Sequence, residues 1–403
     1  MTKKIIEAKL KEIDKIIQKE YHNEKNIGVL TGLSGMALFQ FYYSKYLDIP
    51  DNANTGATIL GHIIEKINDG YNSSLYSNGI AGFGWMIDFL ELNEFIDVES
   101  DDILEELDDF LLAAMNANLD QGNYDFLYGA MGQASYFFNR YKNTKSNSLK
   151  EKYTAILLEF ISSLEMLSEK EGDKIKWPSF LTYIPRKKGY GICLAHGVSS
   201  IISILSKLHK EIAFKDKVEP LIKGGINYVL SFKSTNSEDM CYFPIWVLPN
   251  GEPEGPSRVA WCYGDLGIGT ALLQASKALN DINLKEEALT ILRHTTQRRS
   301  LESTMVTDAG ICHGAFGNAL IYIRIYKETG EEIFKETFEF WINEGVEMGD
   351  FTDGHAGYKM WDPDDEEWSK NTTLLTGITG IGLAMIAYLG DFDSNWDECL
   401  MIS

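Results

Sequence analysis

The feature of this sequence that most constrains its fold is a pattern that occurs seven times. Each copy has a Gly-x-x-Gly pair followed by an apolar stretch, except that Ser200 replaces the second glycine of the fourth copy. The first glycines of the copies are Gly32, Gly79, Gly129, Gly197, Gly264, Gly314 and Gly377. They are separated by 47, 50, 68, 67, 50 and 63 residues. Self-similarity on this scale indicates a repeat architecture.

A second kind of segment alternates with the apolar stretches. These segments place their charged residues on one helical face, as amphipathic helices do. They are Lys3–Glu20, Thr55–Asn68, Asp102–Ala117, Leu149–Glu169, Lys215–Ser231, Asn283–Gln297 and Glu331–Asn343. An apolar helix needs cover on all sides, whereas an amphipathic helix can face water. We therefore expect one all-α domain over residues 1–403, an α/α toroid of seven inner and seven outer helices. The alternative is a helical array in which the glycines serve only close packing.

Three long segments precede inner helices and hold most of the prolines or polar turn residues. They are Gly172–Gly191, Met240–Pro256 and Met348–Asn371. Long loops in compact domains tend to carry function. We expect all three to lie over the end of the barrel at which the inner helices begin.

The composition excludes several classes of function. The net charge is −22 and the isoelectric point is about 4.8, which argues against nucleic-acid binding and against attraction to anionic lipid. The five cysteines are odd in number and widely spaced, unlike a disulfide framework. We see no signal peptide and no apolar run long enough to span a bilayer. These features predict a soluble cytoplasmic protein with reduced thiols.

Residues just before the repeat glycines offer metal ligands. Cys262 and Cys312 each lie two positions before a first glycine, and His313 lies one position before it. Two thiolates and one imidazole form a zinc-binding set that leaves one coordination position open. Two thiolates reduce the Lewis acidity of zinc, which suits the activation of another thiol better than hydrolysis. The alternative is two buried core cysteines and a hydrogen-bonded histidine.

Three further residues are candidates for proton transfer and charge stabilisation. His196 occupies the same register as His313 but has Ala195, not a cysteine, beside it. We interpret it as an acid/base that Asp125 could orient and charge. Arg258, six positions before Gly264, could stabilise a developing oxyanion. An isolated aspartate or arginine is otherwise a surface or capping residue.

The ordered set of motifs resembles the lanthionine synthetase C-like family, the cyclases of lanthipeptide biosynthesis. The shared pieces are Ala195-His196-Gly197, Trp261-Cys262-Tyr263-Gly264, Cys312-His313-Gly314 and Leu375–Gly382. The resemblance implies an α/α toroid with zinc held by Cys262, Cys312 and His313. It also implies His196 as the catalytic acid/base, with Asp125 and Arg258 beside it.

The reaction that this resemblance implies is an intramolecular Michael addition. A cysteine thiolate of a dehydrated precursor peptide adds to dehydroalanine or dehydrobutyrine and closes a lanthionine or methyllanthionine ring. The implied partners are the dehydrated precursor peptide, a separate dehydratase and a transporter. The chain departs from the family at Cys193, where a glycine is usual, and at Ser200. These departures place an extra thiol, of no assigned role, near the site.

Other functions remain open at this point. One is the addition of glutathione to dehydroamino acids, as implied by eukaryotic relatives of the family. Another is a non-catalytic, zinc-containing scaffold that binds peptides. Protein prenyltransferases use an Asp, Cys and His set that this chain does not show in matching order, and toroid glycosidases use paired acids without thiolates.

Overall fold

The inner helices begin where the glycine repeat predicts. The computed structural model describes residues 2–180, 188–363 and 365–402. Within them, seven mostly buried helices each start at the residue after the first glycine of a repeat, and that glycine is the N-cap. They are α2 (Leu33–Leu47), α4 (Ile80–Leu92), α6 (Ala130–Asn143), α8 (Val198–His209), α10 (Asp265–Leu279), α13 (Ala315–Thr329) and α15 (Ile378–Leu389).

The amphipathic segments form the second set of helices. They are α1 (Thr2–Glu20), α3 (Asp51–Asn68), α5 (Ser100–Asp120), α7 (Asn147–Met166), α9 (Lys215–Leu230), α11 (Ile282–Thr295) and α14 (Glu332–Glu347). In α1 the buried residues are Ile6, Leu10, Ile13 and Ile17, the three- and four-residue spacing of one helical face. The predicted segment Leu149–Glu169 is displaced at both ends. Ser146 accepts a hydrogen bond from the Leu149 amide and caps α7, which therefore starts earlier.

Shorter elements complete the helical part of the described chain. They are α12 (Leu301–Thr304) and the 3₁₀ helices η1 (Tyr21–Asn23) and η2 (Trp396–Leu400). Among the helices of the described residues, none combines the length and the apolar character needed to cross a membrane.

The glycines are required because backbone approaches them closely. A Cβ at Gly317 would overlap the carbonyl oxygen of Ile311, six residues earlier. Gly264 has a φ of 99°, a conformation that side chains disfavour, and a Cβ there would overlap the carbonyl oxygen of Arg258. Each glycine thus lets the chain turn back on itself just before an inner helix.

Successive turns are joined through one backbone position, two residues before the first glycine. The Cys312 amide donates to the Leu375 carbonyl at 2.8 Å, and the Leu375 amide donates to the Leu30 carbonyl at 2.8 Å. The Ala195 amide likewise donates to the Cys262 carbonyl at 3.2 Å. Equal positions in the repeat therefore have equal backbone roles.

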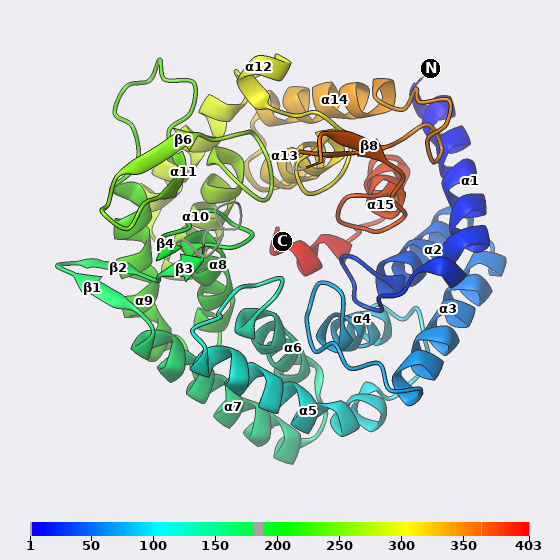
Figure 1. The fold of residues 1–403 in the computed structure, drawn as a ribbon, viewed down its shortest axis with the longest axis horizontal. Coiled ribbons are helices and arrows are strands. Elements are labelled where there is room, and N and C mark those ends of the chain that lie inside the picture. Colours follow the sequence, from blue (N-terminus) through cyan, green and yellow to red (C-terminus); the bar gives the residue numbers. More distant parts are fainter. Residues whose placement is uncertain (1, 181–187, 364, 403) are drawn as a thin grey trace. The chain divides into compact units, whose positions relative to one another are not determined.

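The chain forms two compact units. Unit 1 consists of the residues up to Leu111 together with Thr307–Met401, and unit 2 consists of Leu112–Val306 with Ile402. In unit 1, α2 packs on α3, α13 packs on α14, and α15 packs on α1 and α2. In unit 2, the pairs α6 and α7, α8 and α9, and α10 and α11 pack together, and α8 contacts both α6 and α10 (Figure 1).

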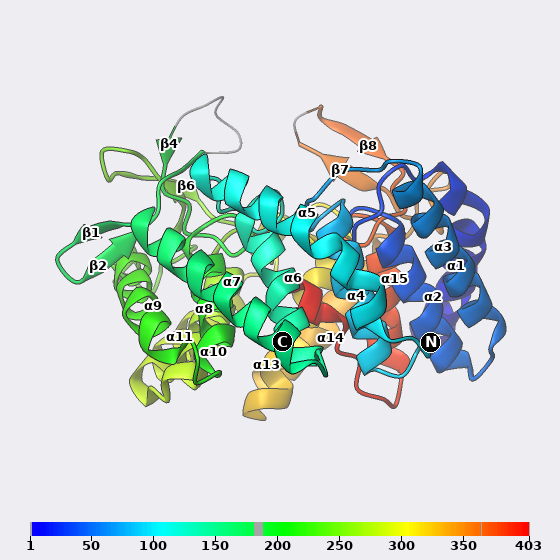
Figure 2. The same cartoon turned by 90° about the horizontal axis from the view of Figure 1, so that it is seen from below.

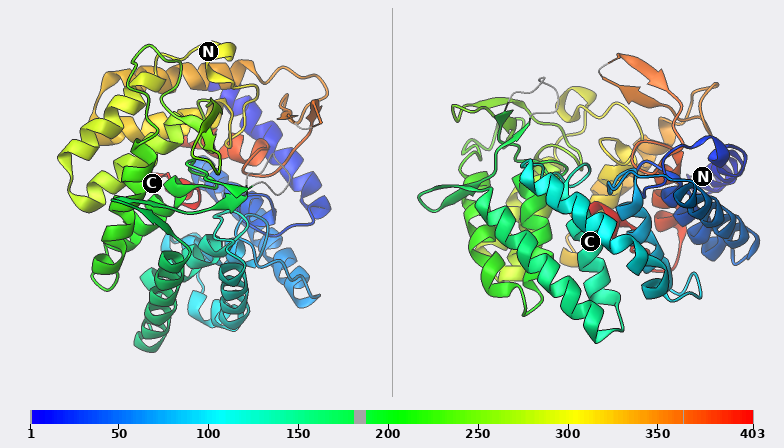
Figure 3. Two further views of the ribbon diagram at one scale, coloured as in Figure 1. Left: turned by 60° about the vertical axis from the view of Figure 1, so that its left-hand side comes forward. Right: turned by 60° about the horizontal axis from the view of Figure 1, so that its bottom comes forward.

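Short antiparallel hairpins occur in the three long segments that the sequence predicts as loops, except that the first strand lies just before Gly172. They pair β1 (Glu169–Glu171) with β2 (Lys174–Lys176), β3 (Ser179–Phe180) with β4 (Lys188–Gly189), β5 (Pro244–Val247) with β6 (Pro253–Pro256), and β7 (Met360–Asp362) with β8 (Glu367–Ser369). Parts of two predicted loops, residues 181–187 and 364, lie outside the described residues. In unit 2, β3–β4 and β5–β6 lie beyond one end of α8–α11 (Figure 2). In unit 1, β7–β8 stands away from the helices (orange in Figure 3).

Candidate functional site

The structure brings His196 and Asp125 together in unit 2. His196 lies in the turn before α8, and Asp125 lies in the turn before α6, 71 residues away in sequence. Nδ1 of His196 is 2.6 Å from Oδ2 of Asp125, and each side chain is 19% exposed. The pair is thus partly reachable from solvent while its hydrogen bond is sheltered.

The Asp125 carboxylate is fixed by its own turn. Its Oδ1 atom accepts hydrogen bonds from the backbone amides of Leu127 and Tyr128, both at 2.8 Å. Its Oδ2 atom is therefore left to accept the Nδ1 proton of His196. This arrangement leaves Nε2 of His196 as the nitrogen that can exchange a proton with a ligand.

The charge of Asp125 also controls the acidity of His196. Burial by itself lowers the pKa of His196, because it disfavours the charged imidazolium. The charge and hydrogen bond of Asp125, with a further contribution from Cys262, oppose this effect, and the net pKa lies above the ordinary value of 6.5. His196 is thereby suited to carry a proton at neutral pH.

Two aromatic rings flank His196. The Tyr128 ring lies nearly parallel to the imidazole at a centroid distance of 6.1 Å, and the Tyr263 ring is tilted against it at 6.0 Å. Tyr128 is 45% exposed and so can contact a ligand as well. Trp261, two residues before Tyr263, is fully buried and packs in the core.

Arg258 and Cys262 lie on one segment of unit 2 that leads into α10. Arg258 is half-buried, and Cys262 is buried with 4% exposure. The hydrogen bond between the Ala195 amide and the Cys262 carbonyl joins this segment to the turn that carries His196. Within unit 2, therefore, His196 and Cys262 lie on directly linked turns.

Cys193, the residue that departs from the family pattern, is also buried in unit 2. Burial, with a smaller contribution from the neighbouring Cys262, raises the pKa of its thiol to about 12. A thiol of this acidity stays protonated at neutral pH and is a poor metal ligand or nucleophile. Cys193 therefore serves packing in this structure.

Cys312 and His313 lie in unit 1, on the turn before α13. Both are partly exposed, and all five cysteines are free thiols. Oδ2 of Asp308 lies 3.7 Å from Nε2 of His313. Asp308 is itself held by the backbone amides of Gly310 and Trp361, at 2.9 and 3.1 Å. A carboxylate on the Nε2 side would leave Nδ1 of His313 to bind a metal.

Cys262, Cys312 and His313 form a group of residues that could hold a metal ion. The donor set fits zinc, because thiolate and imidazole are its preferred ligands and no disulfide engages either sulfur. Three protein ligands would leave a coordination position for a substrate thiol.

Three polar residues of the structure, Tyr128, Asp308 and Asp265, are not among the residues that the sequence analysis selects. Tyr128 precedes a repeat glycine directly, as His196 and His313 do, so its register was a usable signal. Asp308 and Asp265 carry no such signal, because their partners come from other segments of the chain.

Comparison with solved structures defines the class of fold. The structure of nisin cyclase superposes with a TM-score of 0.74 and 18% sequence identity, and the match covers 97% of each chain. The predicted all-α, α/α-toroid fold is thereby confirmed.

The family follows from the sequence match. Residues 23–401 match the family described as "Lanthionine synthetase C-like protein". This protein belongs to the lanthionine synthetase C-like family. A zebrafish (Danio rerio) protein described as "Glutathione S-transferase LANCL1" is 31% identical over 172 residues, a region that spans 42% of this chain and 38% of the zebrafish protein.

Proposed function

We propose that this protein is a zinc-dependent lanthipeptide cyclase that closes thioether rings in a dehydrated precursor peptide. The observation that carries the proposal is the His196–Asp125 pair, with 2.6 Å between Nδ1 and Oδ2, on a turn linked directly to the turn of Cys262. Such a pair can hold a proton for transfer, and the linked turn carries a soft metal ligand. Both features lie within a chain of the lanthionine synthetase C-like family.

Cys262, Cys312 and His313 are the proposed zinc ligands. When bound, zinc would supply the acidity that converts a peptide thiol to a thiolate near neutral pH. The structural support is the chemistry of the donor set, together with Asp308 on the Nε2 side of His313.

His196 and Arg258 then act on the acceptor. The cysteine sulfur of the peptide forms a bond to the β-carbon of the dehydro residue, and the electron pair of the C=C bond moves toward the carbonyl oxygen as an enolate. His196 delivers the proton from Nε2 to the α-carbon, while Asp125 stabilises its imidazolium form beforehand. Arg258 stabilises the enolate charge. The reaction adds S–H across a double bond and needs no oxidant.

The experiment that tests this proposal uses a dehydrated peptide with free cysteines. Ring closure leaves the peptide mass unchanged but removes thiols that an alkylating reagent would label. We expect zinc-loaded protein to remove these thiols and His196→Asn protein to leave them in place. Full labelling of the peptide after incubation with zinc-loaded wild-type protein would contradict the proposal.

A second candidate function is the addition of glutathione to dehydroamino acids. The description of the zebrafish relative as a glutathione S-transferase favours it. Only the thiol donor differs, so the same residues would serve. A dehydrated peptide that lacks cysteine separates the two: a glutathione-adding enzyme raises its mass by one glutathione, whereas a cyclase leaves it unchanged.

The remaining possibility is a zinc-containing scaffold that binds peptides without catalysis. Zinc bound at one equivalent, together with peptide binding and no loss of thiols, would identify it. Thiol labelling, peptide mass and zinc content together thus assign the protein to one of three functions.

A further inference from the structure

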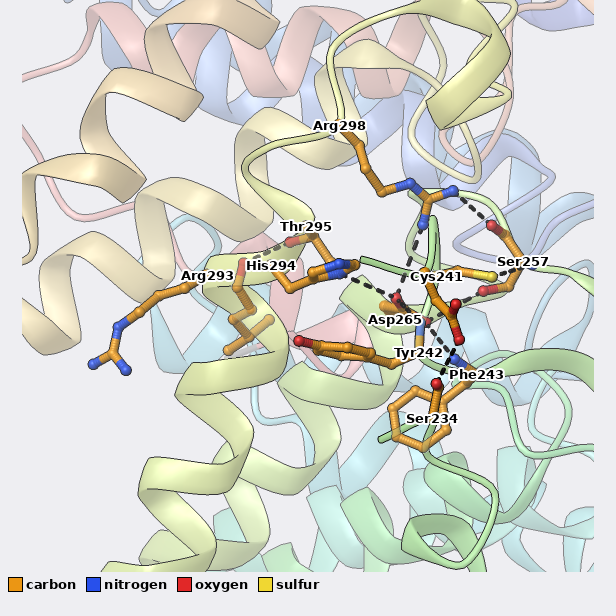
Figure 4. Close-up of polar contacts among 12 residues, drawn as sticks. Ser234, Cys241, Tyr242, Phe243, Ser257, Asp265, Arg293, His294, Thr295 and Arg298 are labelled. Atoms are coloured by element: carbon orange, nitrogen blue, oxygen red, sulfur yellow. Dashed lines mark hydrogen bonds and ion pairs between the residues drawn. The ribbon is translucent and has the colours of Figure 1, made fainter. Parts of the chain in front are cut away.

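Asp265 is a fully buried carboxylate at the start of α10, three residues after Cys262. Its Oδ2 atom accepts a hydrogen bond from the Tyr242 amide at 2.8 Å. Its Oδ1 atom accepts from the Phe243 amide at 3.0 Å and from the Ser257 hydroxyl at 3.3 Å (Figure 4). A buried charge is costly unless it is paired, so these contacts need a cationic partner to complete them.

Arg298 supplies that partner. Its guanidinium is almost fully buried, and Nη1 lies 3.9 Å from Oδ2 of Asp265. Its Nη2 donates to the Ser257 carbonyl at 2.6 Å, and its Nε donates to the Ser303 carbonyl at 2.7 Å. The planar guanidinium therefore joins three segments: the start of α10 and the residue before Arg258, both visible in Figure 4, and α12.

The segment held in this way is the one that carries Arg258 and Cys262. On one side of Arg258, the Ser257 hydroxyl is bonded to Asp265 and the Ser257 carbonyl is bonded to Arg298. On the other side, the Val259 amide donates to the Thr304 carbonyl at 2.9 Å. Hydrogen bonds at both neighbouring residues thus restrain the backbone of Arg258, and this fixes the position of its Cα atom.

We propose that Asp265 and Arg298 are positioning residues, which place Arg258 for enolate stabilisation by holding the segment Ser257–Cys262. This inference rests on the proposed cyclase function, in which Arg258 contacts the reacting carbonyl. The pair acts through Arg258 and does not touch the substrate.

The test uses Arg298→Lys, which keeps the positive charge. A lysine ammonium cannot make both hydrogen bonds of the guanidinium and also keep its ion pair with Asp265, so the Ser257 carbonyl loses its donor. We expect kcat to fall about 10- to 100-fold, with KM nearly unchanged, because a displaced catalytic group costs this much. Arg293→Lys is the matched control. Arg293 lies in α11, five residues before Arg298, and its Nη1 atom is 3.7 Å from Oε2 of Glu286. Its side chain points away from Asp265 in Figure 4.

A double-mutant cycle separates positioning from general stability. If Arg298 acts through Arg258, then Arg298→Lys should change kcat less than about twofold in an Arg258→Ala background, because interacting residues are non-additive. An equal loss of kcat in both backgrounds would overturn the proposal. Ser257→Ala removes only the hydroxyl contact to Asp265, and it should show a smaller effect of the same kind if Arg298→Lys does not fold.

Hydrogen exchange gives a readout that does not depend on activity. Arg298→Lys should speed exchange of the Val259 amide while leaving amides in the middle of α10 unchanged. Unchanged exchange at Val259 would overturn the positioning role. Faster exchange in a protein that lacks cyclase activity would instead show that the positioning stands and the proposed function fails.

Discussion

Replacing Asp125 by asparagine removes one charge at nearly constant shape. Because Oδ1 of Asp125 accepts two backbone amides at 2.8 Å, an asparagine keeps its carbonyl oxygen there. It then presents an NH₂ group to Nδ1 of His196, where the wild type has an oxygen at 2.6 Å. Nδ1 must accept this hydrogen bond, which favours the neutral imidazole with its proton on Nε2.

The size of the effect follows from the lost hydrogen bond. A hydrogen bond to a charged group contributes about 1.5–3 kcal/mol. Since 1.36 kcal/mol corresponds to about tenfold, protonated His196 should become about 10- to 150-fold rarer at neutral pH. We expect turnover to fall by a similar factor where proton delivery limits the rate.

The pH dependence of turnover shows the direction in which the pKa of His196 moves. Asp125 raises the pKa of His196 in the wild type, so the proton donor persists to higher pH and activity falls only as pH rises through that pKa. In Asp125→Asn the pKa is lower, so the alkaline fall should begin at lower pH. Initial rates of thiol loss in a dehydrated peptide, measured across the neutral range, give both quantities. Asp120→Asn, at an exposed position at the end of α5, is the control. Wild-type turnover with an unshifted profile in Asp125→Asn would refute the reasoning.

Three further predictions concern the metal, the thiol and the fold. Cys262→Ala or Cys312→Ala should remove most of the zinc measured by elemental analysis, and full zinc in either variant would reject the ligand assignment. His196→Asn should retain the zinc but lower the cyclisation rate by about 10²- to 10⁴-fold. Uncatalysed cyclisation should accelerate toward the ordinary thiol pKa of about 8.5, while the enzymatic rate should peak near neutrality; parallel rising curves would mean that the metal does not activate the thiol. Gly317→Ala should lower the free energy of unfolding by about 1–3 kcal/mol, because its Cβ overlaps backbone. Gly61→Ala, which meets open space in α3, should raise it by about 0.4–1 kcal/mol in the same urea titration.

The sequence by itself determined where the inner helices begin. Each of the seven starts directly after the first glycine of its repeat. These helix starts could be predicted from the sequence for two local reasons. A residue with a Cβ cannot occupy these turns, and an apolar stretch must be covered on all sides. The same register identified Cys262 as equivalent to Cys312, and His196 as equivalent to His313, because one repeated backbone geometry serves every turn.

The sequence predicts loops where the structure forms short hairpins, because the pairing of these strands depends on contacts beyond the local pattern. The strands β5 and β6 contain three prolines and a glycine, and the sequence reads as a loop. They pair because the turn brings two extended segments together and Val247 also bridges to Tyr190, which precedes α8. That contact is absent from any local pattern.

Only the tertiary structure decided which polar side chains meet. Asp125 and His196 are 71 residues apart, and their hydrogen bond depends on the packing of α6 against α8. Asp265 reads in sequence as an acid favoured at a helix N-terminus. Its partners lie 23 residues before it at Tyr242 and beyond the end of α11 at Arg298. Periodicity along the chain tells which face of a helix is buried. The partner of a buried charge, by contrast, is set by segments that meet only when the helices pack.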